Sequence, residues 1–393
     1  MSKDTFLETL LDGAEVEWVA LGEICKPKRG KRLVKKQLQK TGSYAVYQNS
    51  MKPLGYYEES NVTAGTLFIV CAGAAGEIGY SIEPFWAADD VYYFESNELL
   101  NSKFLYHYLL TQRFKILSRV RRASIPRLSK ESFDKIQIPI PCPENPEKSL
   151  ATQAEIVRIL DTFTELTAEL TAELTARKKQ YNYYRDQLLT FEEGAVETFP
   201  LHEIAHFRNG KGHEKIIDEN GSCVVVNSKF ISTRGAVRKY SSEQLCPLFK
   251  NDILMVMSDL PHGKALAKCF LVDQDDQYTL NQRIGAFSVK DENIISTKFL
   301  FYILDRNRQL LRFDNGADQT NLRKGEILSI KIPVPSKDEQ ARIVAILDKF
   351  DTLTHSISEG LPREIELRQK QYEYYRDVLL NFPKPEPQTE GVA

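Results

Sequence analysis

Several features that mark disulfide-bonded, metal-binding or membrane proteins are missing from this chain. Its 393 residues include six cysteines, and no two of them form a CxxC pair. The sequence therefore indicates neither a disulfide framework nor a zinc ribbon. The longest apolar stretches are far shorter than the roughly 20 residues of a transmembrane helix. The first eleven residues contain acids and lack the basic start of a signal peptide. We expect a cytoplasmic protein that does not enter a membrane.

The usual catalytic signatures are also absent. The chain has no GxxxxGK[ST] loop for a nucleoside triphosphate, no GxGxxG after a strand and no GxSxG nucleophile elbow. It also lacks the Asn/Asp-Pro-Pro-aromatic tetrapeptide with which amino-methyltransferases hold a flipped base. The glycine-rich stretch at 73–79 lies between predicted strands, which favours a turn whose small residues let a backbone approach DNA closely. We expect a non-catalytic chain that holds no cofactor and no metal.

One segment satisfies a zinc-protease motif by its letters alone. Residues 202–206 read HEIAH, and HExxH on a helix places two histidines one turn apart for zinc. The equivalent stretch in the first half of the chain, residues 22–26, reads GEICK and lacks both histidines. We interpret HEIAH as a structural segment that opens a domain.

The most prominent feature present is a duplicated helical segment. Residues 153–191 begin QAEIVRILDTF and residues 340–382 begin QARIVAILDKF. Their shared apolar positions are spaced by three and four residues, which is typical of one face of a helix. The first copy carries them at Ile156, Ile159, Leu160, Phe163, Leu166 and Leu170. A single apolar stripe needs a matching partner, so we predict that the two copies form a two-helix coiled coil.

The two copies differ in length between their matching ends. The first copy contains the tetrapeptide TAEL twice, at 167–170 and 171–174. Four residues correspond to about 6 Å of helix, so one repeat unit would lengthen or shorten the rod. The second copy contains Gly360-Leu361-Pro362, where proline predicts a kink or a break.

The repeat extends over the whole chain. VEW at 16–18 and LGEI at 21–24 recur as VET at 196–198 and LHEI at 201–204, and IPIP at 138–141 recurs as IPVP at 332–335. We therefore predict a unit of roughly 190 residues written twice, with an α+β domain in each half. Predicted strands are 66–70 and 91–95 in the first half and 223–226, 252–257, 268–272 and 284–289 in the second. Predicted helices are 103–117 and 297–311. The tail after Phe382 is predicted to be disordered.

Charge is distributed unevenly although the net charge is only −2. No acid occurs in 25–56 or in 99–130, and each run carries several lysines and arginines. A solvated basic face would explain one such run. Two of them in one half favour a polyanion partner, and we expect DNA contacts from these side chains. The candidates are Lys28, Arg29, Lys31 and Arg32, mainly for phosphates, and Arg121, Arg122 and Arg127 for phosphates or base edges.

The second half offers polar side chains of the types that read base edges. Asparagine and glutamine pair with adenine and arginine pairs with guanine, although polar loops on a solvated edge look the same in sequence. The candidates are Asn281, Gln282, Arg283, Gln319 and Asn321. The tyrosines of the two helix copies favour packing or a partner interface over base stacking. The interface candidates are Tyr181, Tyr184, Tyr372 and Tyr375.

These features together resemble a known family. Two diverged domains, each followed by an IPxP segment and an IVxILD helix, are similar to the specificity (S) subunit of type I restriction-modification systems. IPIPCPENPEKSLATQAEIVRILD, the TAEL repeats and RKKQYNYYRDQLL resemble the IC group of that family. The segments YQNSMKPLGYY and FWAADDVYYFE resemble parts of its target recognition domains.

The resemblance implies a specific architecture. Two similar mixed α/β target recognition domains, residues 1–150 and 192–337, would be separated by two long antiparallel helices, residues 151–191 and 338–382. A tail at 383–393 follows, and the internal repeat gives an approximate twofold symmetry.

The resemblance also implies a function. Each domain would read one half of a split sequence in double-stranded DNA, and the helices would set the spacer between the halves. The chain would assemble with two methyltransferase (M) subunits and two restriction (R) subunits, which use S-adenosylmethionine, ATP and Mg²⁺. The alternatives from the residues alone are a coiled-coil scaffold with two protein-binding domains, or a metalloprotease.

Overall fold

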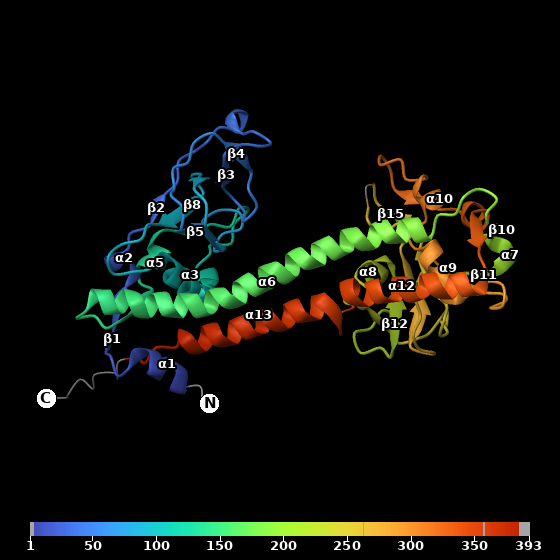
Figure 1. The fold of residues 1–393 in the computed structure, drawn as a ribbon. Coiled ribbons are helices and arrows are strands. Elements are labelled where there is room, and N and C mark those ends of the chain that lie inside the picture. The colour runs from blue at the N-terminus through green and yellow to red at the C-terminus, as the bar shows by residue number, and fades with distance from the viewer. Residues whose placement is uncertain (1–3, 262, 357, 385–393) are drawn as a thin grey trace. The chain divides into compact units, whose positions relative to one another are not determined.

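The computed structural model describes residues 4–261, 263–356 and 358–384 (Figure 1). The chain folds into two compact units. Unit 1 comprises residues 4–172 and 363–384, and unit 2 comprises the described residues between 173 and 362. In the part of the chain that is described, no helix is both long enough and apolar enough to span a bilayer.

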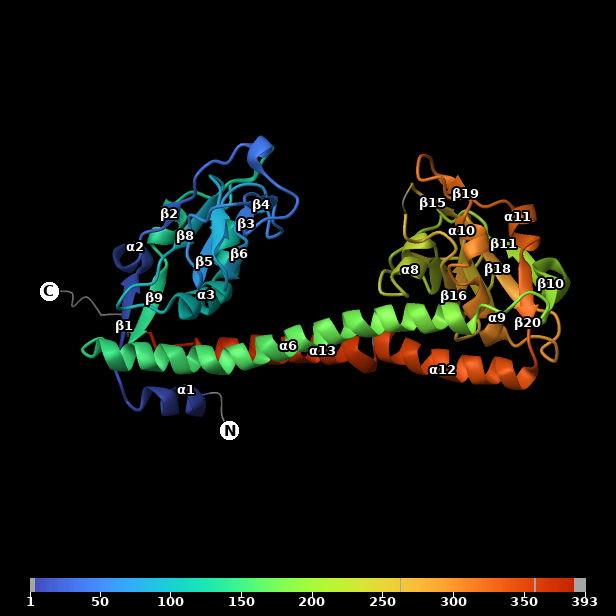
Figure 2. The ribbon, with the colours of Figure 1, turned by 45° about the horizontal axis from the view of Figure 1, so that its top comes forward.

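The duplicated segments form the long helices α6 (Pro146–Leu188), α12 (Lys337–His355) and α13 (Gly360–Leu379). In unit 1, α6 and α13 lie side by side in both ribbon views (Figures 1 and 2). Ile156 near the start of α6 shares a core with Leu379 at the end of α13, so the two helices are antiparallel. The ring of Phe163 stacks on Tyr375 with centroids 4.9 Å apart. The predicted pairing of these helices is confirmed here.

In unit 2, the last turns of α6 pack on α12 in the same way. The ring of Tyr184 stacks on Phe350 with centroids 5.8 Å apart, and Leu188 belongs to the core that contains Leu347. The predicted break is also confirmed, because α12 ends at His355 and α13 begins at Gly360. Pro362 lies in the first turn of α13, where a helix needs no N–H from it.

Unit 1 contains three sheets. A four-stranded sheet has the order β2-β8-β5-β6, a three-stranded sheet has the order β4-β3-β7, and β1 pairs with β9. Its strands are β1 (Val16–Ala20), β2 (Lys28–Arg29), β3 (Tyr44–Tyr47), β4 (Gly55–Tyr57), β5 (Thr66–Val70), β6 (Ile78–Ser81), β7 (Phe85–Ala87), β8 (Val91–Phe94) and β9 (Gln137–Pro141). Its shorter helices are α1 (Asp4–Leu11), α2 (Leu21–Ile24), the 3₁₀ turn η1 (Lys35–Gln37), α3 (Ser102–Thr111), α4 (Arg113–Ser118) and α5 (Glu131–Asp134).

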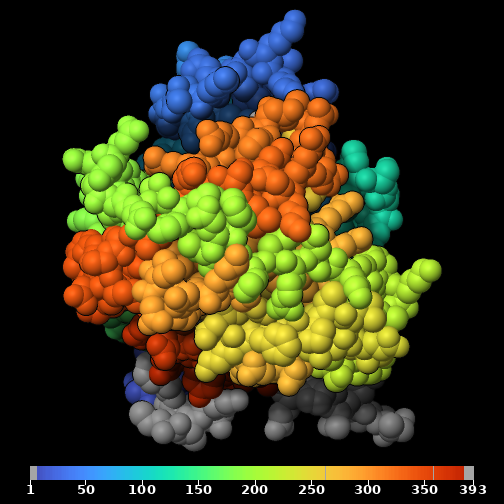
Figure 3. All heavy atoms as spheres, turned by 90° about the vertical axis from the view of Figure 1, so that its right-hand side faces the viewer, coloured from blue at the N-terminus to red at the C-terminus, as the bar shows by residue number. Residues whose placement is uncertain are grey.

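Unit 2 repeats these three sheets strand for strand and adds a two-stranded sheet, β15-β19. The orders are β11-β18-β14-β16 and β13-β12-β17, and β10 pairs with β20. The strands are β10 (Glu197–Pro200), β11 (Ala205–Asn209), β12 (Cys223–Val226), β13 (Tyr240–Ser241), β14 (Ile253–Val256), β15 (Ser258–Asp259), β16 (Cys269–Leu271), β17 (Tyr278–Leu280), β18 (Ile284–Val289), β19 (Thr320–Asn321) and β20 (Lys331–Val334). The shorter helices are α7 (Leu201–Ile204), α8 (Ser228–Ser232), α9 (Thr297–Leu304), α10 (Arg308–Leu311) and α11 (Lys324–Leu328). The N-terminal strand of this unit, β10, pairs antiparallel with the late strand β20. Figure 3 shows green, yellow and orange parts of the chain side by side on one face of this unit.

All six predicted strands are present, but the two predicted helices are each divided. The first becomes α3 and α4, with Gln112 between them. The second becomes α9 and α10, and Arg306 between them has φ 56°, in the left-handed region that a helix does not use. The apolar periodicity of 103–117 and 297–311 continues across each break, which is why the sequence predicted single helices.

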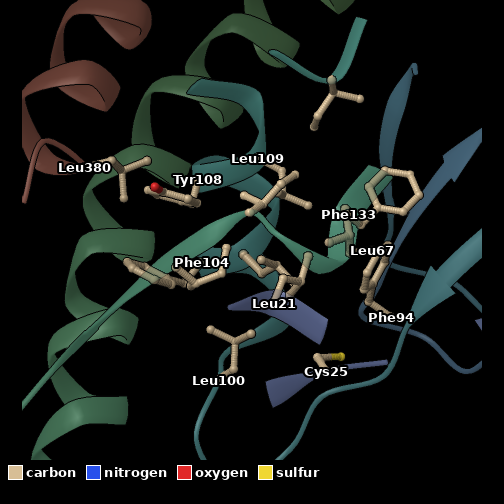
Figure 4. Close-up of a cluster of buried hydrophobic side chains, with 14 of the residues drawn as sticks. Leu21, Cys25, Leu67, Phe94, Leu100, Phe104, Tyr108, Leu109, Phe133 and Leu380 are labelled. Carbon is tan, nitrogen blue, oxygen red and sulfur yellow. The ribbon is translucent and has the colours of Figure 1, made fainter. Parts of the chain in front are cut away.

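The core of unit 1 joins the sheets to the long helices. All five residues of β5 are buried. Figure 4 shows Leu67 of β5 near Phe94 and Phe133, with Phe104, Tyr108 and Leu380 in the same cluster. Phe94 and Phe133 meet edge to face with centroids 5.8 Å apart. The large apolar side chains of α3 thereby fix the sheet to the end of α13.

A buried glutamine anchors α6 and α12 to the loop that precedes the packed helix of each unit. In unit 1, Oε1 of Gln153 accepts the N–H of Asn101 at 2.9 Å and Nε2 donates to the carbonyl of Leu99 at 3.0 Å. In unit 2, Oε1 of Gln340 accepts the N–H of Ser296 at 2.8 Å. The joint between sheet domain and long helix is therefore built twice.

An aspartate further along each of these helices forms a second contact that recurs in both units. Asp161 pairs with Nζ of Lys103 at 2.7 Å, and Nε2 of His107 lies 3.3 Å from its other oxygen. The ring of His107 also meets the hydroxyl of Tyr372 through Nδ1 at 2.8 Å. In unit 2, Asp348 pairs with Nζ of Lys298 at 2.5 Å. Each sheet domain is therefore held to its long helix by a matching ion pair.

Candidate nucleic-acid interface

The loops that carry most of the candidate DNA-binding residues gather at one end of each unit. In unit 1, β3 and β7 run parallel, so both end on the same side, and β5 ends opposite the start of β8. We call residues 48–54, 71–77, 88–90 and 119–128 the loop end of unit 1. The loop end of unit 2 consists of residues 227, 257–261, 263–267, 281–283 and 315–321, which follow the equivalent strands.

The first basic run leads along β2 toward the loop end. Lys28, Arg29, Lys31 and Arg32 are all exposed. Nζ of Lys28 pairs with Glu95 at 2.6 Å, and this hydrogen bond raises the pKa of Lys28. Nε of Arg29 donates to the carbonyl of Asp89 at 2.8 Å. Within the described residues, no hydrogen bond or ion pair holds the side chains of Lys31 and Arg32, which leaves them available to phosphates.

The second basic run is pinned at the loop end by its backbone. Arg121 and Arg127 exchange two backbone hydrogen bonds, of 2.8 and 3.1 Å, and so close a small loop that carries Arg122 at its surface. Arg127 also forms a bridge with Ala72. The structure thus brings Arg121, Arg122 and Arg127 together beside the glycine-rich turn.

The glycine-rich turn is shaped by contacts within the chain. Gly73 has φ 78°, and a Cβ there would lie 2.7 Å from the carbonyl oxygen of Asn49. The N–H of Ala74 donates to that same carbonyl at 2.9 Å. Glycine at 73 is therefore explained by the neighbouring loop of unit 1. Burial, together with the nearby Asp90, raises the pKa of Cys71 at the start of this turn to about 11, so its thiol stays protonated.

Unit 2 carries a different set of side chains on the same framework. Ser258 pairs with Asn321 as Ala72 pairs with Arg127, so Asn321 takes the position of Arg127. Nε2 of Gln319 donates to Oγ of Ser258 at 2.8 Å. The other three candidates, Asn281, Gln282 and Arg283, form the turn between β17 and β18.

Comparison with known proteins identifies the family of this duplicated fold. Residues 14–177 and 193–367 match the type I restriction modification DNA specificity domain, once in each half. The chain belongs to the type I restriction-modification specificity subunit family. It is therefore a non-catalytic specificity subunit, which recognises the DNA target within a type I restriction-modification complex.

Curated relatives and solved structures are similar to this chain over nearly its full length. The specificity subunit is 40% identical over 415 aligned residues to the EcoR124I/EcoR124II specificity subunit of Escherichia coli, covering 98% of this chain and 99% of the relative. A type I S subunit from M. genitalium shares the fold, with TM-score 0.60 at 16% identity over 95% of this chain and 98% of that one. A chain from a structure addressing assembly of the type I system has TM-score 0.57 at 13% identity, over 93% and 98%.

The HEIAH segment of the specificity subunit does not have the geometry of a zinc site. His202 lies in α7, which ends at Ile204, whereas His206 lies in strand β11. Nδ1 of His202 lies 3.1 Å from the carbonyl of Leu328. The two histidines therefore do not share a helical face, and the described residues contain no cluster of potential metal ligands around them.

One basic residue of the candidate interface is not among those predicted from the sequence. Lys211 takes the position of Lys31, because its N–H donates to Leu280 as that of Lys31 donates to Ala87. The signal was present as Gly-Lys at 30–31 and 210–211, at the same offset as the LxEI segments. The glycine is required, since a Cβ at Gly210 would lie 2.0 Å from a backbone oxygen.

The four tyrosines proposed for partner contact divide into two kinds. Tyr181 is only 6% exposed, and the hydroxyl of Tyr372 is bound to His107, so both pack within their own units. Tyr184 and Tyr375 are 40% and 38% exposed on the stacked pairs with Phe350 and Phe163. The specificity subunit thus presents one aromatic patch of the same construction in each unit.

Proposed function

We propose that this specificity subunit recognises a split sequence in double-stranded DNA, one half through the loop end of each unit. The observation that carries the proposal is the duplication of the loop end. The same strands and turns recur in both units, yet the exposed side chains differ, with Arg127 in one place where Asn321 stands in the other. A shared scaffold with different polar side chains suits two different half-sites.

The exposed cations support a contribution from phosphates. Lys31, Arg32, Arg122 and Arg127 are exposed and lie on or next to the loop end of unit 1. Side chains of this kind position a protein on the duplex and make its affinity depend on salt. The polar candidates Asn281, Gln282, Arg283, Gln319 and Asn321 are proposed as base contacts of unit 2.

We propose residues 1–150 and 192–337 as the two target recognition domains and residues 151–191 and 338–382 as the spacer helices. The continuous α6 supports this division, because it enters both units. A rigid helix of defined length would set the number of unread base pairs between the half-sites. The proposed tail at 383–393 lies almost entirely outside the described residues, apart from Pro383 and Lys384.

The two aromatic patches support assembly with two identical partners. Phe163 with Tyr375 and Phe350 with Tyr184 offer the same stacked pair twice, and exposed tyrosines are enriched at protein interfaces. We propose two methyltransferase subunits at these patches and two restriction subunits in the nuclease complex. S-adenosylmethionine, ATP and Mg²⁺ would be used by those partners in the cytoplasm, and the specificity subunit itself would hold no cofactor.

Methylome sequencing tests the proposal directly. The specificity subunit is expressed with its methyltransferase partner in a host without adenine methylation, and modified sites are mapped. We expect a two-part motif with a spacer of fixed length. Methylation without a fixed motif, or a motif that is one continuous sequence, would show that the two units do not each read one half of a split sequence.

A further inference from the structure

The turn between β7 and β8 is a part of the unit 1 loop end that the basic runs do not include. It consists of Ala88–Asp90 and is held by backbone bonds on both sides. The N–H of Ala88 donates to the carbonyl of Tyr47 at 2.9 Å, and the N–H of Cys71 donates to that of Asp90 at 2.7 Å. The turn is therefore fixed between the ends of β3, β5 and β7.

Unit 2 holds Asn281–Arg283 by the same bonds. The N–H of Asn281 donates to the carbonyl of Val226 at 3.2 Å, and the N–H of Met257 donates to that of Arg283 at 3.0 Å. The two turns thus have one backbone framework and three differing side chains. Ala88, Asp89 and Asp90 stand where Asn281, Gln282 and Arg283 stand.

Each turn contains one buried side-chain oxygen without a partner. Among the described residues, only three buried side-chain polar atoms lack a hydrogen bond, and two of them are Oδ1 of Asp89 and Oδ1 of Asn281. Two neighbouring side chains are engaged, since Gln48 donates to Asp90 at 3.5 Å and Gln282 donates to Glu214 at 2.5 Å. Asp89 and Asn281 therefore have no hydrogen bond to break when they turn toward a ligand.

We propose that Asp89 and Asn281 are base-reading side chains, Asp89 for a cytosine and Asn281 for an adenine. This inference rests on the proposed function. A carboxylate only accepts hydrogen bonds, and the cytosine N4 amino group is a donor in the major groove. Guanine and thymine present acceptors there, which repel a carboxylate, and adenine places its N7 acceptor beside its amino donor, so cytosine suits a carboxylate best.

The amide of Asn281 matches a different base edge. An asparagine accepts from the adenine N6 amino group and donates to N7 at the same time, whereas an aspartate cannot make the second bond. The carboxylate of Asp89 also needs compensation near phosphates. Arg29 supplies it, because Nε of Arg29 donates to the carbonyl of Asp89 itself.

Reciprocal substitutions test the inference in the complete methyltransferase. Asp89→Asn places in the unit 1 turn an amide, as Gln282 does at the equivalent position of unit 2, and Asn281→Asp places a carboxylate in the unit 2 turn. By methylome sequencing we expect D89N to change one position of one half-site from cytosine toward adenine. N281D should change one position of the other half-site from adenine toward cytosine. The preference should shift by about tenfold or more at each position.

Glu83→Gln is the matched control, because Glu83 is an exposed acid at the opposite end of β7. It should leave the motif unchanged. An unchanged motif in D89N would overturn the inference while leaving the proposed function intact. A wild-type complex that recognises no split motif would instead overturn the proposed function. Changes in the same half-site for D89N and N281D would contradict the assignment of the two turns to different half-sites.

A measurement on the unaltered complex covers the case in which D89N fails to fold. Each cytosine of the recognised half-sites is replaced singly by 2-pyrimidinone, which lacks the 4-amino group. One replacement should weaken binding about tenfold, and D89N, where it folds, should be insensitive to that replacement. Equal binding to all replaced duplexes would overturn the proposal for Asp89.

Discussion

Gln340 offers a quantitative test of how the sheet domain of unit 2 is held to its helix. Its side chain is 1% exposed and makes three hydrogen bonds. Its Oε1 accepts the N–H of Ser296 at 2.8 Å, and its Nε2 donates to the carbonyls of Ile294 and Pro335, both at 2.9 Å. Gln340→Leu keeps the volume and removes all three bonds.

The expected loss follows from those three bonds. A typical intramolecular hydrogen bond contributes about 1 kcal/mol, and the backbone groups left buried here have no substitute partner, so Gln340→Leu should destabilise unit 2 by about 3 kcal/mol. With a urea m value of about 2–3 kcal/mol/M, the unfolding midpoint should fall by about 1 M. Arg342→Ala is the control, because its ion pair with Glu339 is exposed and contributes little to stability.

The assay can separate the two units. The chain has two tryptophans, Trp18 and Trp86, and both lie in unit 1. Gln340→Leu should therefore shift the transition seen by far-UV circular dichroism and leave the tryptophan fluorescence transition in place. Gln153→Leu, the equivalent change in unit 1, should shift the fluorescence transition.

Two outcomes would refute this reasoning. A midpoint shift for Gln340→Leu no larger than that of Arg342→Ala would show that the three bonds do not hold the joint. An equal shift in both signals would show that the two units unfold as one cooperative body.

The remaining predictions address pH, spacer, specificity and assembly. Burial lowers the pKa of His107, so the unfolded chain binds its proton more readily. Unit 1 should lose stability as pH falls below about 6.5, and His107→Gln should flatten that dependence in fluorescence-monitored urea unfolding. Deleting Thr171–Leu174 shortens α6 by about 6 Å, and methylome mapping should show a spacer one or two base pairs different with unchanged half-sites. Altered half-site bases would contradict the spacer role. Arg283→Ala should relax one position of one half-site by about tenfold or more, whereas a uniform loss across all sequences would indicate a phosphate contact. Tyr184→Ala and Tyr375→Ala should each weaken binding of the methyltransferase partner in a titration, and the double variant should weaken it further; unchanged binding in the double variant would exclude these patches.

The internal repeat was the most informative signal in the sequence. Positions spaced by three and four residues predicted the long helices and their pairing, because an apolar stripe leaves few alternatives in water. Gly360-Leu361-Pro362 predicted the break between α12 and α13 for an equally local reason. The breaks between α3 and α4 and between α9 and α10 were missed, because one residue with non-helical dihedral angles, Gln112 or the left-handed Arg306, interrupts a helix without interrupting its periodicity.

By itself the sequence determined the duplication, the α+β class, the helix pair and the family, since each depends on patterns of neighbouring residues. The tertiary structure alone decided which side chains share a loop end. Ala72 and Arg127 meet through a bridge between segments 55 residues apart, and the turn with Asp89 occupies the place of the turn with Asn281 although the two share almost no sequence. Strand register and backbone hydrogen bonds fix such positions, and neither is written in the local pattern of residues.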